Sequence, residues 1–405
     1  MNRVAVTGLG CISALGHDSE HLRQGILSGR SAIGPLTVTA SERLTVKIAA
    51  EVRAFDPLAH FDEKRLLLLD RFSQFALVAA REAIAMSGLD LKGEAGLRTA
   101  AIIGSGVGGM TTLDESFQRL YLENAKRFQP FIIPKLMISA AVSHVTMEHG
   151  IRGPAFTVAS ACASANHAIG VAFQMVRSGM TDIAVTGGAE SVFTLGTLKA
   201  WEAMRILAPD TCRPFSRDRK GLVLGEGAGI LVLENWERAR ARGIPILGEI
   251  LGFGMSADAG DVVMPSVDGA VAAMRGAIAD SGLKPEAFEY INAHGTGTGA
   301  NDVTETRAIH QVFGAHARKL AVSSTKSLHG HALGAAGAIE AIATLQAMQG
   351  GFLPPTANFT EADPDCDLDY VPNTPRQRAF RLALSNSFAF GGLNAALVLG
   401  ANSLR

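Results

Sequence analysis

The chain alternates short apolar runs that end in glycine with longer segments of helical periodicity, and no other feature restricts its fold as strongly. The apolar runs "RVAVTGL", "TAAIIGSG", "FTVASA", "DIAVTGG" and "AGILVLE" predict buried strands. Between them, "FSQFALVAAREAIAMSG" and "HAIGVAFQMVRSG" carry apolar side chains at helical spacing, and Gly88 and Gly179 are expected to cap these helices. The alternation predicts a layered α/β fold with a largely parallel sheet.

An internal repeat adds a second constraint. Shifted by 164 positions, "VASACASANHAIG" lies over "VSSTKSLHGHALG", so that Cys162 meets Lys326. Both copies are expected to form a strand, a turn of small residues and a helix. We therefore predict a duplicated α/β unit, with one half at 1–245 and the other at 246–405, whose two turns meet in a central cleft.

Composition and charge exclude several classes of protein. The 37 basic and 38 acidic residues nearly cancel, which argues against a chain-wide nucleic-acid or membrane-binding surface. No apolar run reaches the roughly 18 residues that span a bilayer, and the N-terminus enters a strand pattern without a signal-peptide core. The cysteines are too sparse and too far apart for a disulfide scaffold or a CxxC site: Cys11, Cys162, Cys212 and Cys366. We expect a cytoplasmic protein.

Cys162 stands among seven consecutive small side chains, Ala159 to Ala165. If it starts a helix, the free N–H groups and the helix dipole there favour thiolate and lower the pKa of the thiol. The same N–H groups can receive an oxyanion when a thioester is attacked. The alternative is a buried cysteine that acts as a small apolar side chain, which is the commoner case for such a stretch taken alone.

In "YINAHGTGTGAND" a predicted strand ends at His294 and alternating glycine and threonine follow. The glycines permit a tight turn, and the hydroxyls of Thr296 and Thr298 can hydrogen-bond an extended polar ligand. The alternative is a simple glycine turn beside a core histidine whose hydrogen bonds are satisfied. This segment alone does not decide between them.

In "SSTKSLHGHALGAAGAIEA", Lys326 and Glu340 are expected to form a buried ion pair, because a lysine in a dry cleft needs a partner. His329 and His331 have no cysteine or carboxylate beside them at ligand spacing, so no metal site is predicted. The string "GSGVGG" matches a nucleotide-binding pattern, but the helix and acidic residue that should follow are poorly matched. We expect a glycine loop that lines a cleft.

Together these motifs resemble the condensing enzymes of the thiolase superfamily, and most closely the β-ketoacyl-acyl-carrier-protein synthase II type. The resemblance runs from "VAVTGLG" to the C-terminus and includes "GIRGPAFTVASACASANHAIG", "RPFSRDRKGLVLGEGAG", "INAHGTGTGAND" and "SNSFAFGGLNA". It implies a thiolase-like, five-layered αβαβα fold. It also implies an acyltransferase that performs a decarboxylative Claisen condensation with malonyl-acyl carrier protein, in fatty-acid or specialised polyketide or polyene synthesis.

The resemblance assigns catalytic roles. Cys162 matches the nucleophile that accepts the acyl group. His294 and His331 match the pair that holds the malonyl thioester carbonyl during decarboxylation. Lys326 matches the lysine beside them, and Glu340 matches the carboxylate that pairs with this lysine.

Other positions match residues that bind substrate or partners. Phe390 matches a gate whose backbone N–H completes the oxyanion hole, and Thr296 and Thr298 match hydroxyls that bind phosphopantetheine. An acidic carrier protein is the implied partner, and its candidate docking residues are Lys64, Arg65, Lys126, Arg127 and Arg205; exposed charges without a specific role are the alternative. The resemblance also implies a homodimer joined through "FTVASA", and no metal, nucleotide or flavin cofactor.

The sequence departs from this family at four positions near the implied site. Gly, Thr, Phe and Thr are the usual residues where this chain has Ala389, Leu393, Leu222 and His329. A Cβ at Ala389 is expected to restrict the turn that carries Phe390. No catalytic group is lost, so a specialised relative that makes polyketide, polyene or nodulation-type chains fits as well as housekeeping elongation.

Three other functions share part of this pattern. A thiolase needs a second cysteine in the C-terminal glycine turn, and "FAFGGLN" has none. A papain-like hydrolase would carry local motifs that this sequence lacks. A chain-length-determining partner subunit of a heterodimeric ketosynthase remains the alternative from another class, although such partners normally lack the nucleophile.

Overall fold

The computed structural model describes residues 1–38 and 40–402. Ten strands form the main sheet: β1 (Val4–Ser13), β4 (Thr99–Gly104), β5 (Ala155–Val158), β6 (Ile183–Glu190), β7 (Gly227–Asn235), β8 (Gly248–Ala257), β9 (Tyr290–Asn292), β10 (Ala321–Ser323), β13 (Leu382–Ala389) and β14 (Leu393–Gly400). Two small sheets pair β2 (Gly34–Pro35) with β3 (Ile48–Ala49), and β11 (Phe352–Leu353) with β12 (Arg376–Gln377).

The two halves of the main sheet have the same topology. The strand order is β10-β9-β13-β14-β8-β1-β7-β6-β4-β5. When the five strands of each half are numbered in their order along the chain, both halves have the third strand at the edge, followed by the second, fourth, fifth and first toward the centre. Only the outer three strands of each half are parallel, and every pairing between β6 and β13 is antiparallel. The prediction of a largely parallel sheet is therefore wrong. A short turn joins β13 to β14, and such a link allows only antiparallel pairing.

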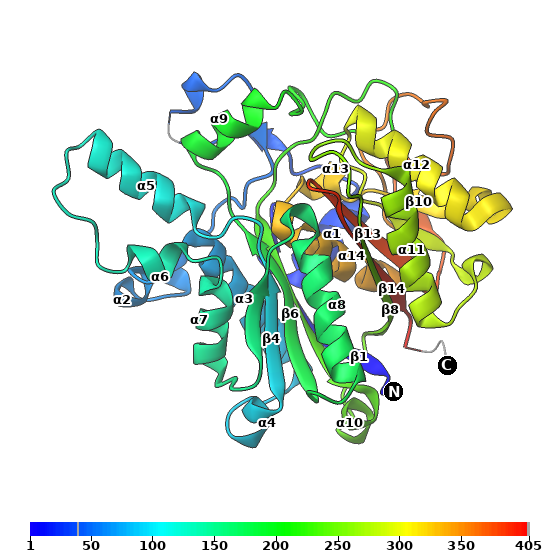
Figure 1. The fold of residues 1–405 in the computed structure, drawn as a ribbon, viewed down its shortest axis with the longest axis horizontal. Coiled ribbons are helices and arrows are strands. Elements are labelled where there is room, and N and C mark those ends of the chain that lie inside the picture. The colour runs from blue at the N-terminus through cyan, green and yellow to red at the C-terminus, as the bar shows by residue number, and fades with distance from the viewer. Residues whose placement is uncertain (39, 403–405) are drawn as a thin grey trace.

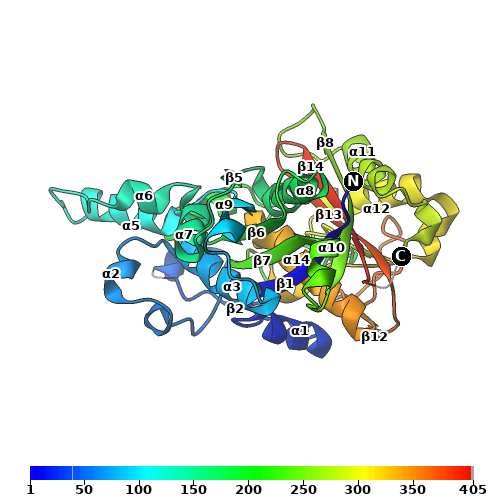
Figure 2. The same cartoon turned by 90° about the horizontal axis from the view of Figure 1, so that it is seen from below.

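Helices cover both outer faces of the sheet halves and fill the space between them. α3 (Arg71–Ser87) and α7 (Ala140–His149) pack on the first half, and α11 (Val267–Ser281) and α12 (Gly299–Phe313) on the second. α8 (Ser164–Arg177) and α14 (Ala336–Gly350) form the central layer, which Figure 2 shows between the outer helices. The predicted five-layered αβαβα arrangement is thus observed (Figure 1).

The remaining helices are shorter or peripheral. They are α1 (Ser19–Ser28), α2 (Glu63–Leu66), α4 (Glu94–Leu97), α5 (Met110–Tyr121), α6 (Ile132–Leu136), α9 (Leu195–Ala203), α10 (Trp236–Ala241) and α13 (Lys326–His329), with 3₁₀ turns η3 (Ala161–Ala163) and η6 (Leu333–Ala335) before the central helices. Among residues 1–38 and 40–402, no helix has the length and apolar character needed to cross a bilayer. The boundary of the halves after residue 245 stays a prediction.

The turns before the central helices correct the register of the internal repeat. Ala161 and Leu333 open η3 and η6 with φ of 48° and 46°, and each turn leads directly into a central helix. Cys162 therefore corresponds in structure to Gly334 and not to Lys326. The reason is an insertion: the second copy places α13 between its strand and its 3₁₀ turn, and the first copy does not.

Candidate active site

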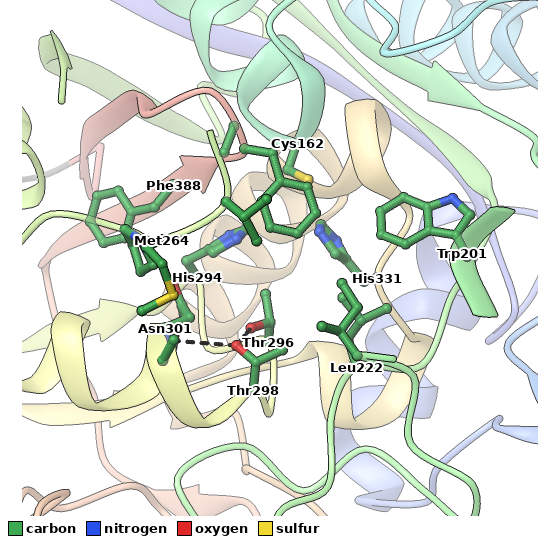
Figure 3. A pocket seen from close by; sticks show the side chains of 16 residues that line it. Cys162, Trp201, Leu222, Met264, His294, Thr296, Thr298, Asn301, His331 and Phe388 are labelled. Atoms are coloured by element: carbon green, nitrogen blue, oxygen red, sulfur yellow. Dashed lines mark hydrogen bonds between the residues drawn. The ribbon is translucent and has the colours of Figure 1, made fainter. Parts of the chain in front are cut away.

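A cavity of about 150 Å³ lies beside the N-terminal end of α8. Both halves of the chain line it: Cys162 comes from η3 of the first half, and His294 and His331 come from the segments that follow β9 and β10 of the second. In Figure 3 the Cys162 side chain and the two imidazole rings point into the same space. The predicted convergence of both halves on one cleft is therefore observed.

The thiol of Cys162 is nearly sealed from solvent, with 7% of the residue exposed. Burial raises the pKa of Cys162 to about 12, while the Lys326 ammonium and the backbone N–H groups of Cys162 and Phe390 oppose this rise. The prediction of a lowered thiol pKa is therefore wrong, because the effect of burial on the pKa is larger than the opposing effect of the nearby charge and N–H groups. The backbone N–H groups of Cys162 and Phe390, which the resemblance assigns to the oxyanion hole, nevertheless both lower the pKa of this thiol.

The His294 and His331 rings lie with their centroids 5.4 Å apart and their planes at 82°. Burial, and then the nearby Lys326 ammonium, lower the pKa of both imidazoles well below 6.5. Both rings are thus neutral near pH 7, and each carries one N–H that it can donate. Neither Nδ1 atom has a hydrogen-bond partner, which argues against a core histidine with satisfied hydrogen bonds.

Lys326 lies behind the cavity and does not line it. Its ammonium donates to the Glu340 carboxylate, and to the carbonyl oxygen of His294 at 2.6 Å. Burial raises the pKa of Glu340 to about 7, whereas the Lys326 charge lowers it. The predicted ion pair is thus present and fully buried, and the hydrogen bond from Lys326 to a cavity-lining residue is made to the His294 backbone.

Replacing Glu340 by glutamine is expected to lower the free energy of unfolding by about 3–5 kcal/mol, because the substitution leaves a buried ammonium without its counter-charge. Urea unfolding followed by circular dichroism measures the loss. The exposed pair of Glu237 and Arg240 supplies a control, and Glu237→Gln should change stability little. Equal losses in both variants would contradict the expectation.

Glu305 is a site residue that the sequence reasoning missed. Its carboxylate, on α12, accepts from the backbone N–H groups of His294 at 2.9 Å and Gly295 at 2.8 Å, and from the Asn386 amide at 3.0 Å. It thereby fixes the His294 backbone from the side opposite Lys326. The available signal was an acidic residue in the helix directly after "HGTGTG".

The polar and aromatic walls of the cavity include the other predicted contacts. Thr296 and Thr298 both line it, with their hydroxyl oxygens 3.0 Å apart, and Thr298 also caps α12. The Phe390 ring stacks on Trp201, with the ring centroids 6.2 Å apart at 27°. Trp201, from α9, was not predicted, because it lies outside every motif that the resemblance carried.

The departures from the resembled family fall in or beside this cavity. Leu222 and Ala389 line it, and Ala389 pairs with Leu393 in regular β13–β14 register. The left-handed φ values of the turn belong to Gly391 and Gly392, at 82° and 67°. The expected restriction at Ala389 therefore does not arise from backbone strain, and the added Cβ forms part of the cavity wall instead.

The "GSGVGG" loop, Gly104–Gly109, does not belong to the lining of this cavity. Its N–H groups are occupied by the buried carboxylate of Glu190, which accepts from Gly106 at 2.6 Å and from Val107 at 3.3 Å. The same carboxylate accepts from the Gly334 N–H at 3.0 Å. The loop thus binds a protein carboxylate where a nucleotide site would hold phosphate.

The candidate docking residues lie on the surface away from the cavity lining. α2 and the segment after α5 line one hollow of about 660 Å³, which includes Arg127. Arg65 pairs with Glu148 at 2.7 Å, and the other four candidates are exposed: Lys64, Lys126, Arg127 and Arg205. Arg205 follows α9 and does not line this hollow.

The sequence matches two parts of one family. Residues 1–239 match "Beta-ketoacyl synthase, N-terminal domain", and residues 247–360 match "Beta-ketoacyl synthase, C-terminal domain". The chain belongs to the β-ketoacyl synthase family. The prediction of a synthase II type condensing enzyme is confirmed, and so is its reaction class, condensation in fatty-acid or polyketide synthesis.

Relatives with known names support the same conclusion. "Nodulation protein E" of a Rhizobium species is 51% identical over 98% of both chains, and "3-oxoacyl-[acyl-carrier-protein] synthase 2" of a Synechocystis species is 42% identical over 98% of this chain and 97% of its own. A solved structure, "The ishigamide ketosynthase/chain length factor", is 37% identical with a TM-score of 0.94, over 99% of this chain and all of that one. The predicted thiolase-like α/β fold of this β-ketoacyl synthase is confirmed.

Proposed function

We propose that this β-ketoacyl synthase is a β-ketoacyl-[acyl-carrier-protein] synthase of the type II class, which condenses an acyl group on Cys162 with malonyl-acyl carrier protein. One observation carries the proposal: a thiol and two neutral imidazoles, delivered by different halves of the chain, line a single apolar cavity. The Synechocystis relative, whose name specifies an acyl-carrier-protein substrate, supports the partner.

In the first half-reaction the Cys162 sulfur attacks the thioester of an acyl carrier protein. A new carbon–sulfur bond forms, the bond to the carrier sulfur breaks, and the Cys162 proton leaves with the carrier thiol. The backbone N–H groups of Cys162 and Phe390, both of which favour the thiolate form of Cys162, would stabilise the oxyanion of the tetrahedral intermediate. The acyl chain would extend along the apolar wall that includes Trp201 and Leu222.

In the second half-reaction malonyl-acyl carrier protein enters past Thr296 and Thr298, whose hydroxyls would bind its phosphopantetheine arm. The bond to the malonyl carboxylate breaks, carbon dioxide leaves, and the electron pair forms an enolate. The neutral rings of His294 and His331 would each donate an N–H to the enolate oxygen. The carbanion then attacks the acyl thioester, a carbon–carbon bond forms, and the Cys162 thiolate leaves and regains a proton.

The assembly that we propose is a homodimer joined along β5. Among residues 1–38 and 40–402 this strand pairs only with β4, at an edge of the main sheet, and its Phe156 is 41% exposed. The ishigamide structure is named for a ketosynthase with a chain length factor, so a heterodimer is the alternative. Cys162, His294 and His331 are all present here, which favours the catalytic subunit in either case.

For pathway and compartment we propose specialised acyl-chain synthesis in the cytoplasm. The 51% identity to nodulation protein E supports the specialised role. The four cysteines are all free and buried, which suits a reducing compartment. The exposed residues Lys64, Lys126, Arg127 and Arg205, with Arg65, are proposed to dock the acidic carrier protein. The reaction as written requires no cofactor.

The purified enzyme, offered acyl carrier proteins loaded with chains of graded length together with malonyl-acyl carrier protein, is expected to release carbon dioxide and form β-ketoacyl-carrier protein. Intact-protein mass spectrometry detects both the acylated enzyme and the extended carrier. The series also identifies the preferred chain length. An enzyme that only hydrolyses the acyl thioester, or that never becomes acylated, would overturn the proposed function.

A further inference from the structure

The His331 ring has no hydrogen bond that sets its orientation. A catalytic histidine is ordinarily oriented by a bond to the ring nitrogen that does not face the substrate. Here the Nδ1 atom of His331 is buried and has no partner. The direction of the ring therefore depends on how firmly its own peptide groups are held.

One side of the His331 backbone is held by the first half of the chain. Its N–H donates to the Val223 carbonyl at 2.8 Å, and its carbonyl accepts from the Gly225 N–H at 2.9 Å. The preceding residue, Gly330, has φ of 69°. Glycine adopts positive and negative φ about equally readily, so its own backbone does not hold this conformation. The Gly330–His331 peptide is thus held at its N–H, and a partner for its carbonyl oxygen would complete the restraint.

His329 supplies a contact to that peptide plane. Its Nδ1 lies 2.9 Å from the Gly330 carbonyl oxygen and its Nε2 lies 3.0 Å from the Thr325 hydroxyl. A carbonyl only accepts, so Nδ1 carries the proton and Nε2 accepts from the hydroxyl. Burial lowers the pKa of His329 to about 3, which keeps the ring neutral and its two hydrogen bonds in this arrangement near pH 7.

We propose that His329 is a positioning residue that clamps the Gly330 carbonyl to Thr325 and thereby aims the His331 ring into the cavity. His329 itself is 1% exposed and does not line the cavity, so it acts through the peptide of its neighbour. The clamp joins the start of α13 to the residue that follows this helix. The inference rests on the proposed role of His331 in decarboxylation.

The sharpest test removes one bond of the clamp, the one between His329 and the Thr325 hydroxyl, without touching His329. Thr325→Val keeps the shape of the side chain but leaves the His329 Nε2 without its donor, and Thr325→Ser is the matched control that restores a hydroxyl. We expect Thr325→Val to lower kcat for carbon dioxide release from malonyl-acyl carrier protein about tenfold, with little change in KM. Thr325→Ser should stay close to the parent enzyme.

A second variant tests the other bond of the clamp. His329→Asn retains a short amide donor for the Gly330 carbonyl and should release carbon dioxide faster than His329→Ala. The rate of Cys162 acylation, measured by mass spectrometry in the same samples, should be unchanged in the folded variants. This split separates an effect on His331 from general damage to the fold.

Two results would overturn the positioning role. The first is carbon dioxide release by Thr325→Val at the parental rate. The second is a loss of acylation and decarboxylation in equal proportion, which indicates a structural role alone. If the parent enzyme itself neither condenses nor decarboxylates, the proposed function fails instead, so the two failures are distinguishable.

Discussion

Replacing Cys162 by alanine is expected to reduce acyl transfer and condensation below detection while leaving malonyl decarboxylation measurable. The sulfur is the atom that would carry the acyl chain, and no other thiol lines the cavity. The histidines that would stabilise the enolate remain in place. Carbon dioxide release without chain extension is therefore the expected signature of this variant.

Mass spectrometry of the enzyme after incubation with acyl carrier protein checks this expectation. The parent should gain one acyl group on the peptide that contains Cys162, and the variant should gain none. Cys366→Ala is a suitable control, because Cys366 is also free and buried but lies away from the cavity lining. An acyl group found on Cys11, Cys212 or Cys366 in the parent would contradict the assignment.

Replacing His294 or His331 by alanine is expected to lower carbon dioxide release by a factor of about 10²–10³ for each. This is the usual cost of removing one preorganised donor to an oxyanion. Acylation of Cys162 should survive in both variants, since the backbone N–H groups act at that step. Release of labelled carbon dioxide from malonyl-acyl carrier protein measures the effect, and unchanged release would remove both rings from the mechanism.

The same histidines predict a pH profile. A lowered pKa means that each ring stays neutral until the pH falls below that lowered value, which lies well under 6.5. Their titration should therefore cause no loss of carbon dioxide release between pH 8 and 6.5. A drop centred near the ordinary histidine pKa would indicate that at least one ring is solvated in the working enzyme.

The individual motifs were predictable from sequence because each is local. Cys162, His294 and Lys326 each lie at or just after the end of a strand, in a short run of small residues whose spacing is visible without coordinates. The internal repeat predicted that the two halves converge, although its alignment was wrong after the strand, where α13 is inserted in the second copy. An insertion of one short helix leaves the strand order intact, and the strand order brings the turns together.

What could not be predicted depends on distant parts of the chain. The high pKa of Cys162 comes from burial, which sums over side chains that are far apart in sequence. The Glu190 carboxylate accepts a hydrogen bond from the N–H of Gly106, which lies more than 80 residues earlier in the sequence. Trp201 lines the cavity from a helix that carries no recognisable motif. The antiparallel centre of the sheet was also missed, because periodicity identifies strands but not the direction of their neighbours.

The pairing of β1 with β8 has a consequence for how this enzyme admits its substrates. A continuous ladder of backbone hydrogen bonds crosses the middle of the molecule, and the apolar α14 is buried along almost its whole length. A hinge motion that separates the two halves would break these hydrogen bonds and expose α14 to water. We therefore expect substrates to reach the sulfur through movements of side chains that line the cavity, and the stacked rings of Phe390 and Trp201 are the candidates.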